Sequence, residues 1–204
     1  MTQIRDFQDR LKLPVIAAPM FLASGRDLVI AACRAGIVGT FPALNLRSTE
    51  ALAAQIELIR ESLSPDDPPF GVNLIVRRSN ERLEADLREI VRGKVPLVIT
   101  SLGAVREVVE AVHDYGGLVF HDVTNRLHAE KAAAAGVDES IRICVAATPP
   151  PCCQGFDDYR LPCLDTTSRR SSAASRRGSV FGFAAEDARL SGSIAFAASW
   201  RNAC

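Results

Sequence analysis

The chain has 204 residues, of which 48% are hydrophobic and 24% are charged, and its formal net charge is zero. A chain of this length buries roughly two thirds of its unfolded surface in one core, so a single globular domain is expected. The balanced charge gives no sign of a nucleic-acid or membrane partner. No signal-peptide pattern opens the sequence and no apolar run approaches the roughly 20 residues of a membrane span, so a cytoplasmic protein is expected.

The cysteine and histidine residues do not predict a disulfide framework or a metal site. Only Cys33 lies in the first two thirds of the chain, and Cys152, Cys153 and Cys163 lack a paired C-x-x-C spacing. His121 and Asp122 are adjacent, and neighbouring residues of a strand point to opposite faces, so they cannot readily chelate one ion.

From about residue 13 to 145, short β-branched runs alternate with amphipathic helical stretches, which is typical of βα units around a parallel sheet. The first strand is expected at residues 15–20, and the first helix at 26–35 with Gly36 ending it. The remaining strands are expected at 37–41, 70–73, 97–101, 118–121 and 141–145, and the remaining helices near 48–63, 80–91, 105–112 and 125–135. This order fits either a (β/α)8 barrel or an open doubly wound sheet. No G-x-G-x-x-G follows the first strand, which argues against a dinucleotide-binding sheet.

The last third of the chain has a different composition. Residues 148–204 are rich in Pro, Ser, Arg and Cys, which is typical of a low-complexity segment, and only 189–195 has the pattern of a strand. The sequence thus divides into an ordered part at 1–147 and an irregular tail at 148–204. A shift of the reading frame shortly after Asp138 is one hypothesis for this tail, and truncation or genuine divergence are the others.

Several short motifs occur in an order and spacing that point to one family. They are Leu13-Pro-Val-Ile-Ala-Ala-Pro-Met20, Ala35-Gly-Ile-Val-Gly39, Phe70-Gly-Val-Asn-Leu74, His121-Asp-Val-Thr124 and Ala135-Gly-Val-Asp138. Over about residues 10 to 140 the chain resembles the nitronate monooxygenase, or 2-nitropropane dioxygenase-like, family of FMN-dependent enzymes. The resemblance implies an α/β fold of the (β/α)8 TIM-barrel type. Such a barrel normally takes about 250 residues and eight strands, so an incomplete one is expected here.

The resemblance also implies where FMN would lie, across the carboxyl ends of the strands. The backbone around Pro19, Met20 and Phe21 would lie against the flavin ring, and the amide of Asn73 would hydrogen-bond it. Asp122 aligns with a position where relatives place a lysine or glutamine near the cofactor, although a carboxylate there would repel a phosphate. Without the family pattern, Met20 would be read as a core residue and Asn73 as a turn or cap residue.

The resemblance implies a phosphate contact from Gly192 and Ser193, but the catalytic residue is unknown. Relatives carry an Ala-Gly-Gly-His-x-Gly type segment after the sixth strand, whose histidine is the base that removes a proton from a nitroalkane. Here the corresponding residues 143–153 contain neither glycine nor histidine.

Three functions remain open from the sequence. The first is an FMN-dependent oxidoreductase that takes a small-molecule nitronate and O2 to a carbonyl compound and nitrite; without the histidine, a preformed nitronate is the expected substrate. The second is a flavin-dependent enoyl-thioester reductase that draws electrons from a nicotinamide. The third is a catalytically inactive fragment without flavin.

Overall fold

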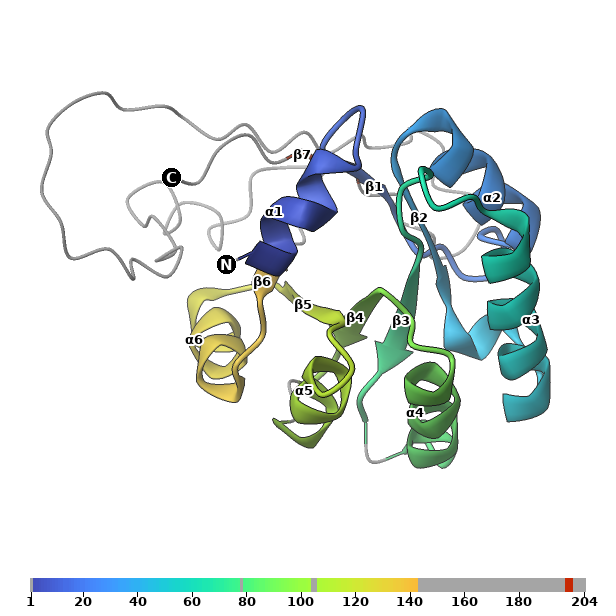
Figure 1. The fold of residues 1–204 in the computed structure, drawn as a ribbon. Coiled ribbons are helices and arrows are strands. Elements are labelled where there is room, and N and C mark those ends of the chain that lie inside the picture. Colours follow the sequence, from blue (N-terminus) through green and yellow to red (C-terminus); the bar gives the residue numbers. More distant parts are fainter. Residues whose placement is uncertain (1, 78, 104–105, 143–196, 200–204) are drawn as a thin grey trace, which may run out of the picture.

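The computed structural model describes residues 2–77, 79–103, 106–142 and 197–199. In these residues the chain forms a curled sheet of six parallel strands with helices alternating between them (Figure 1). Neighbouring strands follow the order β6-β5-β4-β3-β2-β1-β7. This arrangement is part of a (β/α) barrel, as the sequence predicts.

The strands are β1 (Val15–Ala17), β2 (Val38–Pro42), β3 (Gly71–Ile75), β4 (Leu97–Ser101), β5 (Leu118–Val123), β6 (Glu139–Arg142) and β7 (Ala197–Ser199). The helices are α1 (Thr2–Asp9), α2 (Arg26–Ala35), α3 (Thr49–Ser62), α4 (Leu83–Arg92), α5 (Arg106–His113) and α6 (Arg126–Ala135), with a 3-10 turn η1 (Ala43–Asn45).

Local sequence signals account for where several helices begin and end. Ser48 caps α3 by accepting a hydrogen bond from the Ala51 N–H, and Asn125 caps α6 in the same way. Gly36 ends α2 with φ at 99°, in the left-handed region that glycine adopts without steric cost. These signals explain why α2, α3 and α6 lie close to their expected positions.

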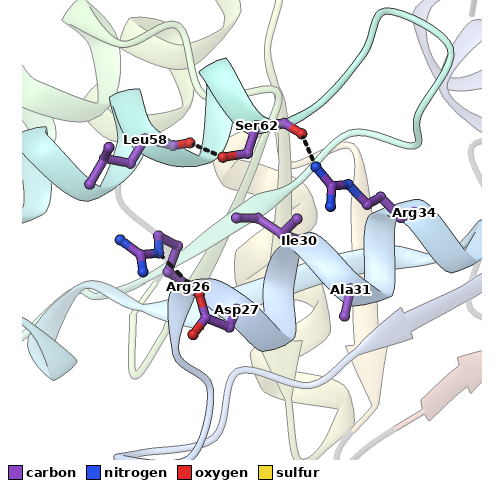
Figure 2. Close-up of a pocket in the computed structure, with 7 residues that line it drawn as sticks. All are labelled: Arg26, Asp27, Ile30, Ala31, Arg34, Leu58 and Ser62. Atoms are coloured by element: carbon purple, nitrogen blue, oxygen red, sulfur yellow. Dashed lines mark hydrogen bonds and ion pairs between the residues drawn. The ribbon is translucent and has the colours of Figure 1, made fainter.

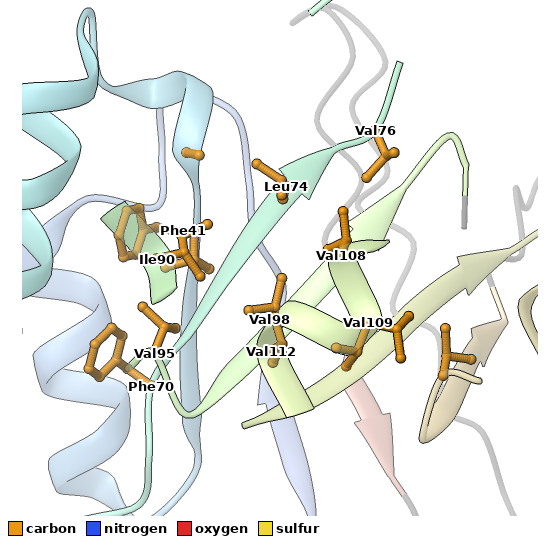
Figure 3. Packing of buried hydrophobic residues seen from close by; sticks show 14 of the residues in the cluster. Phe41, Phe70, Leu74, Val76, Ile90, Val95, Val98, Val108, Val109 and Val112 are labelled. Atoms are coloured by element: carbon orange, nitrogen blue, oxygen red, sulfur yellow. The ribbon is translucent and has the colours of Figure 1, made fainter. Parts of the chain in front are cut away.

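The convex face of the sheet carries the larger hydrophobic cluster. Side chains from alternate positions of the strands pack there against the apolar faces of α2 to α6. Figure 3 shows the part of this cluster around Ile90 of α4 and Val108, Val109 and Val112 of α5. Phe41, Leu74 and Val98 from the sheet meet Ile90 and Val109 from the helices, and all five are less than 4% exposed. Because both faces of the strands are covered, their sequences are nearly continuously apolar.

The concave face is covered by α1, a helix that the sequence analysis did not predict. Phe7 of α1 packs against Phe120 of β5 with ring centroids 6.2 Å apart, and Ile4 and Leu11 lie against the same cluster. In Figure 1, α1 lies on the opposite side of the sheet from α4 and α5. The cluster also contains Leu97 and Leu118, the first residues of β4 and β5, so α1 fills the amino-terminal half of the concave face.

Several strand boundaries differ from the prediction. β1 ends at Ala17 rather than at residue 20, because the chain turns through Pro19, which has no N–H for the sheet. β3 continues two residues past Asn73. The sixth strand begins at Glu139 rather than at residue 141, and its predicted end at 145 lies outside the described part of the chain.

The seventh strand lies on the free edge of β1. β7 pairs with β1 antiparallel, with Val15 opposite Ser199 and Ala17 opposite Ala197. The strand pattern at 189–195 falls on residues that the structure does not describe. In a closed parallel barrel this edge would hold a parallel strand, so the described residues form an open barrel.

Replacing Phe7 by alanine tests whether α1 is part of the core. Phe7 is 6% exposed, so its truncation is expected to lower the free energy of unfolding by about 3 kcal/mol. Phe21 is 58% exposed, and its replacement by alanine serves as the matched control, expected to change stability by less than about 0.5 kcal/mol. Denaturant unfolding would measure both, and equal effects would contradict this packing of α1.

Candidate functional site at the carboxyl ends of the strands

Polar side chains line the concave face near the carboxyl ends of β3, β4 and β5. Asn73 lies opposite Ile99 of β4, and Ile99 lies opposite Phe120 of β5; Ile99 and Phe120 belong to the concave cluster. Since side chains two apart on a strand share a face, Ser101 and Asp122 also point to the concave side. Asn73 is thus level with Ile99 and Phe120 of the apolar cluster, whereas Ser101 and Asp122 lie one side-chain step nearer the carboxyl ends of their strands.

Hydrogen bonds hold Asn73 in this group of three side chains, which we call the Asn73–Ser101–Asp122 row. Asn73 Nδ2 donates to the Ile99 carbonyl at 3.1 Å and to Ser101 Oγ at 2.6 Å. Ser101 lies beside Asp122 on the neighbouring strand, and its hydroxyl lowers the pKa of that carboxyl. A carbonyl can only accept, so the bond to Ile99 fixes which end of the Asn73 amide is Nδ2. Both amide protons are therefore used within the protein, and Oδ1 is the atom left to accept a hydrogen bond from a ligand.

Burial changes the acidity of two carboxyl groups on the concave face. It raises the pKa of Asp122 above its ordinary value, and the hydrogen bond from Ser101 and the nearby His121 offset this rise in part. Burial also raises the pKa of Glu139, which lies opposite Phe120 in β6, and the negative charge of Asp138 adds to that rise. Both groups therefore hold a proton to higher pH than exposed carboxyls do.

The loop after β1 contains the other predicted contact residues. The Met20 N–H donates to Ser24 Oγ at 2.9 Å, and the Met20 carbonyl accepts from Asn45 Nδ2 at 3.2 Å. The backbone polar groups of Met20 are thus already bonded within the protein. Pro19 and Met20 are half-buried and Phe21 is exposed, so the loop offers a ligand packing surface rather than a Met20 hydrogen bond.

His121 lies away from this site, on the opposite face of β5. Its Nδ1 is 2.8 Å from Thr100 Oγ1, and burial lowers the pKa of the imidazole. His113 pairs with Asp138, and His128 contacts Thr124. Within the residues that the structure describes, no three His, Cys, Asp or Glu side chains are grouped to hold a metal ion.

A surface pocket of about 370 Å³ lies between α2 and α3 (Figure 2). It is open to solvent, and Arg34 spans its end by donating to the Ser62 carbonyl at 2.8 Å. Its walls come from these two helices and not from the strands. This pocket is therefore separate from the carboxyl-end site. Its lining residues are Arg26, Asp27, Ile30, Ala31, Arg34, Leu58 and Ser62.

The structure brings Asn73 and Asp122 together through Ser101, which the sequence analysis did not single out. It also adds Glu139 on the concave face and Ser24 and Asn45 around the β1 loop. The sequence offered one signal for Ser101: it carries a hydroxyl two residues after the buried Ile99 of β4, and therefore on the same face of the strand. Gly192 and Ser193, and the segment 143–153 where the family histidine is expected, lie outside the described residues.

No family model matches the chain. The chain is similar in structure to FabK from Thermotoga maritima, with a TM-score of 0.59 and 23% identity over 67% of this chain and 43% of that one. It is similar to nitroalkane oxidase from Streptomyces ansochromogenes, with a TM-score of 0.59 and 24% identity over 66% and 47%. It is also similar to the enoyl reductase domain of MlnA from Bacillus amyloliquefaciens, with a TM-score of 0.54 and 14% identity over 62% of this chain and 32% of that one.

These similarities identify the fold as part of a (β/α) barrel. The chain spans less than half the length of each of these solved structures. Among the described helices, none combines the length and apolar character that crossing a membrane requires.

The raised pKa of Asp122 predicts how its replacement by asparagine changes stability with pH. A carboxyl whose pKa rises on folding stabilises the protein below its unfolded pKa, ordinarily 3.8, and this contribution is lost as pH rises through the folded pKa. As pH rises from acidic to neutral, the free energy of unfolding of Asp122→Asn should therefore increase relative to that of the unchanged protein. Denaturant unfolding at the two pH values measures this difference.

Asp67 provides a control of opposite sign. Hydrogen bonds from the Ser64 N–H and hydroxyl lower its pKa, so its stabilising contribution is present above the unfolded pKa and lost as pH falls. Asp67→Asn should lose stability relative to the unchanged protein as pH rises. Parallel pH trends for the two variants would refute the burial effect at Asp122.

Proposed function

We propose that this chain forms the part of a flavin-dependent oxidoreductase that contacts the cofactor ring. The observation that supports the proposal best is the Asn73–Ser101–Asp122 row, a group of polar side chains toward the carboxyl edge of a barrel sheet, next to the apolar cluster that α1 covers. Active sites of barrels of this type are built at that edge. The named enzymes of similar fold, a nitroalkane oxidase and an enoyl reductase domain, support oxidation and reduction chemistry.

The residues present fit the ring of FMN. Asn73 Oδ1 is an acceptor for a ring N–H, and Nδ2 is fixed by Ile99 and Ser101, so the acceptor is held in place before a ligand arrives. The Met20 peptide, with both its polar groups already bonded, offers a surface against which a planar ring can pack. The predicted phosphate contacts, Gly192 and Ser193, are part of this proposal.

Bound flavin would supply the redox chemistry, and the protein would orient the substrate and exclude water. Alkyl nitronates with O2 are the proposed substrates, as the family resemblance implies. Asp122 is an acidic group at the carboxyl end of β5 whose pKa is raised by burial, so it is able to hold a proton near a bound substrate.

Flavin binding tests the proposal directly. The purified chain should retain FMN after dialysis and show the visible absorption of a bound flavin. Asn73→Ala should weaken binding by about tenfold, since it removes a hydrogen bond worth about 1.4 kcal/mol. Thr100→Val is the matched control, because it removes a buried hydroxyl from the opposite face of the neighbouring strand. A chain that stays colourless with added FMN would instead be an inactive fragment.

Substrate assays separate the two enzyme functions. With FMN bound, a preformed alkyl nitronate should support O2 uptake and nitrite release. The neutral nitroalkane should react at least about 100-fold more slowly than the nitronate, because a general base contributes roughly that factor or more. NADH consumption that depends on an enoyl thioester, without nitrite from the nitronate, would assign the reductase function instead.

A further inference from the structure

The loop between β1 and α2 is closed by the side chain of Ser24. Ser24 Oγ accepts from the Met20 N–H at 2.9 Å and donates to the Ala18 carbonyl at 3.0 Å, while the Ser24 N–H donates to the Met20 carbonyl at 3.0 Å. Ser24 is 1% exposed. These bonds hold the two sides of the loop together. None of them involves the N–H of Leu22, which lies at the tip of the loop.

Asn45 supplies that partner from outside the loop. It is the last residue of η1, directly after β2. Its Oδ1 accepts from the Leu22 N–H at 3.0 Å, and its Nδ2 donates to the carbonyls of Met20 and Ser24, each at 3.2 Å. The acceptor and both donors of a single amide are therefore spent on one loop.

The conformation that Asn45 holds is an uncommon one. Leu22 has φ at 62°, in the left-handed region that a leucine rarely adopts, and its side chain is 78% exposed. Such a conformation persists where surrounding contacts impose it. No packing of the Leu22 side chain imposes it here, because that side chain is mostly in solvent, so the hydrogen bond to Asn45 is the contact that does.

The other side of η1 is anchored as well. Arg82 Nη1 donates to the Leu46 carbonyl at 2.7 Å, and Arg82 Nη2 pairs with Asp86 Oδ1 at 3.0 Å. Asp86 is fully buried and also accepts from Thr49 Oγ1 at 2.6 Å. Separating Arg82 from Asp86 would leave a buried charge without its partner, which is strongly destabilising. The turn that carries Asn45 is thus fixed to α3 and α4, and Asn45 can impose a conformation on the loop rather than follow it.

We propose that Asn45 is a positioning residue of the carboxyl-end site: it presets the Met20–Ser24 backbone in the shape that contacts the cofactor ring. The inference rests on the proposed flavin function. Asn45 is not one of the predicted contact residues. Its proposed role is to hold the backbone of Met20 and Phe21 in place before the ligand binds. Preorganisation of this kind lowers the conformational cost of binding.

Two substitutions separate this role from a contribution to stability alone. Asn45→Asp keeps an acceptor for the Leu22 N–H but loses both donors and sets a carboxylate against two carbonyl oxygens. Asn45→Ala removes all three hydrogen bonds. Asn125→Ala is the matched control, because Asn125 caps α6 through the His128 N–H at 2.9 Å and does not touch the loop.

Two measurements are made on the full chain and on each variant. The first is FMN affinity, together with the absorption spectrum of the bound flavin. The loss of affinity in each variant is compared with its loss of unfolding free energy. The second is amide hydrogen exchange at Leu22 and Ser24 without flavin. Both Asn45 variants should bind FMN about tenfold more weakly and exchange these amides faster, whereas Asn125→Ala should match the unchanged protein in both at a similar loss of stability.

The outcomes are distinguishable. If the unchanged protein binds FMN and Asn45→Asp binds it equally well with the same spectrum, the positioning role is overturned while the flavin function stands. If Asn125→Ala weakens FMN binding as much as Asn45→Asp does, the effect is one of stability, and the role is again overturned. If the unchanged protein does not bind FMN, the proposed function fails, and fast exchange in the Asn45 variants would then show only a structural clamp.

Discussion

The parallel register of β3, β4 and β5 is the constraint on which the rest of this structure depends. Backbone hydrogen bonds place Asn73 opposite Ile99 and Ile99 opposite Phe120. Because side chains alternate between faces, a slip of one residue in any of these pairs would turn the polar row into the helix layer and expose apolar groups on the concave side. The apolar packing on both faces fixes the register, and the register fixes the site.

The concave face is divided along the strands into two halves of different chemistry. Toward the amino ends, α1 buries Phe7 against Phe120 and its neighbours. Toward the carboxyl ends, Asn73 Nδ2 donates to the Ile99 carbonyl and to Ser101 Oγ, and Ser101 lies beside Asp122. A buried polar network costs little only when its members are paired. This pairing allows polar side chains to lie next to an apolar core and still leave Asn73 Oδ1 for a ligand.

The sequence predicted the order of strands and helices of the barrel from 15 to 142, because buried parallel strands and capped amphipathic helices leave strong local patterns. It did not predict α1, whose eight residues contain only Ile4 and Phe7 as apolar anchors, too few to distinguish a helix from a loop. It placed Asn73 and Asp122 toward the carboxyl ends of β3 and β5, where the structure has them, but Ser101 and Asn45 act through contacts 20 or more residues away in sequence. Such contacts depend on the tertiary fold and leave no local pattern.

The antiparallel pairing at one margin of the sheet bears on how the barrel could be completed. β7 pairs with β1 in the reverse direction, so backbone hydrogen bonds already occupy this edge of β1. An occupied edge is a poor template for a further strand. The same antiparallel cover means that any parallel strand completing the barrel at β1 must first displace β7.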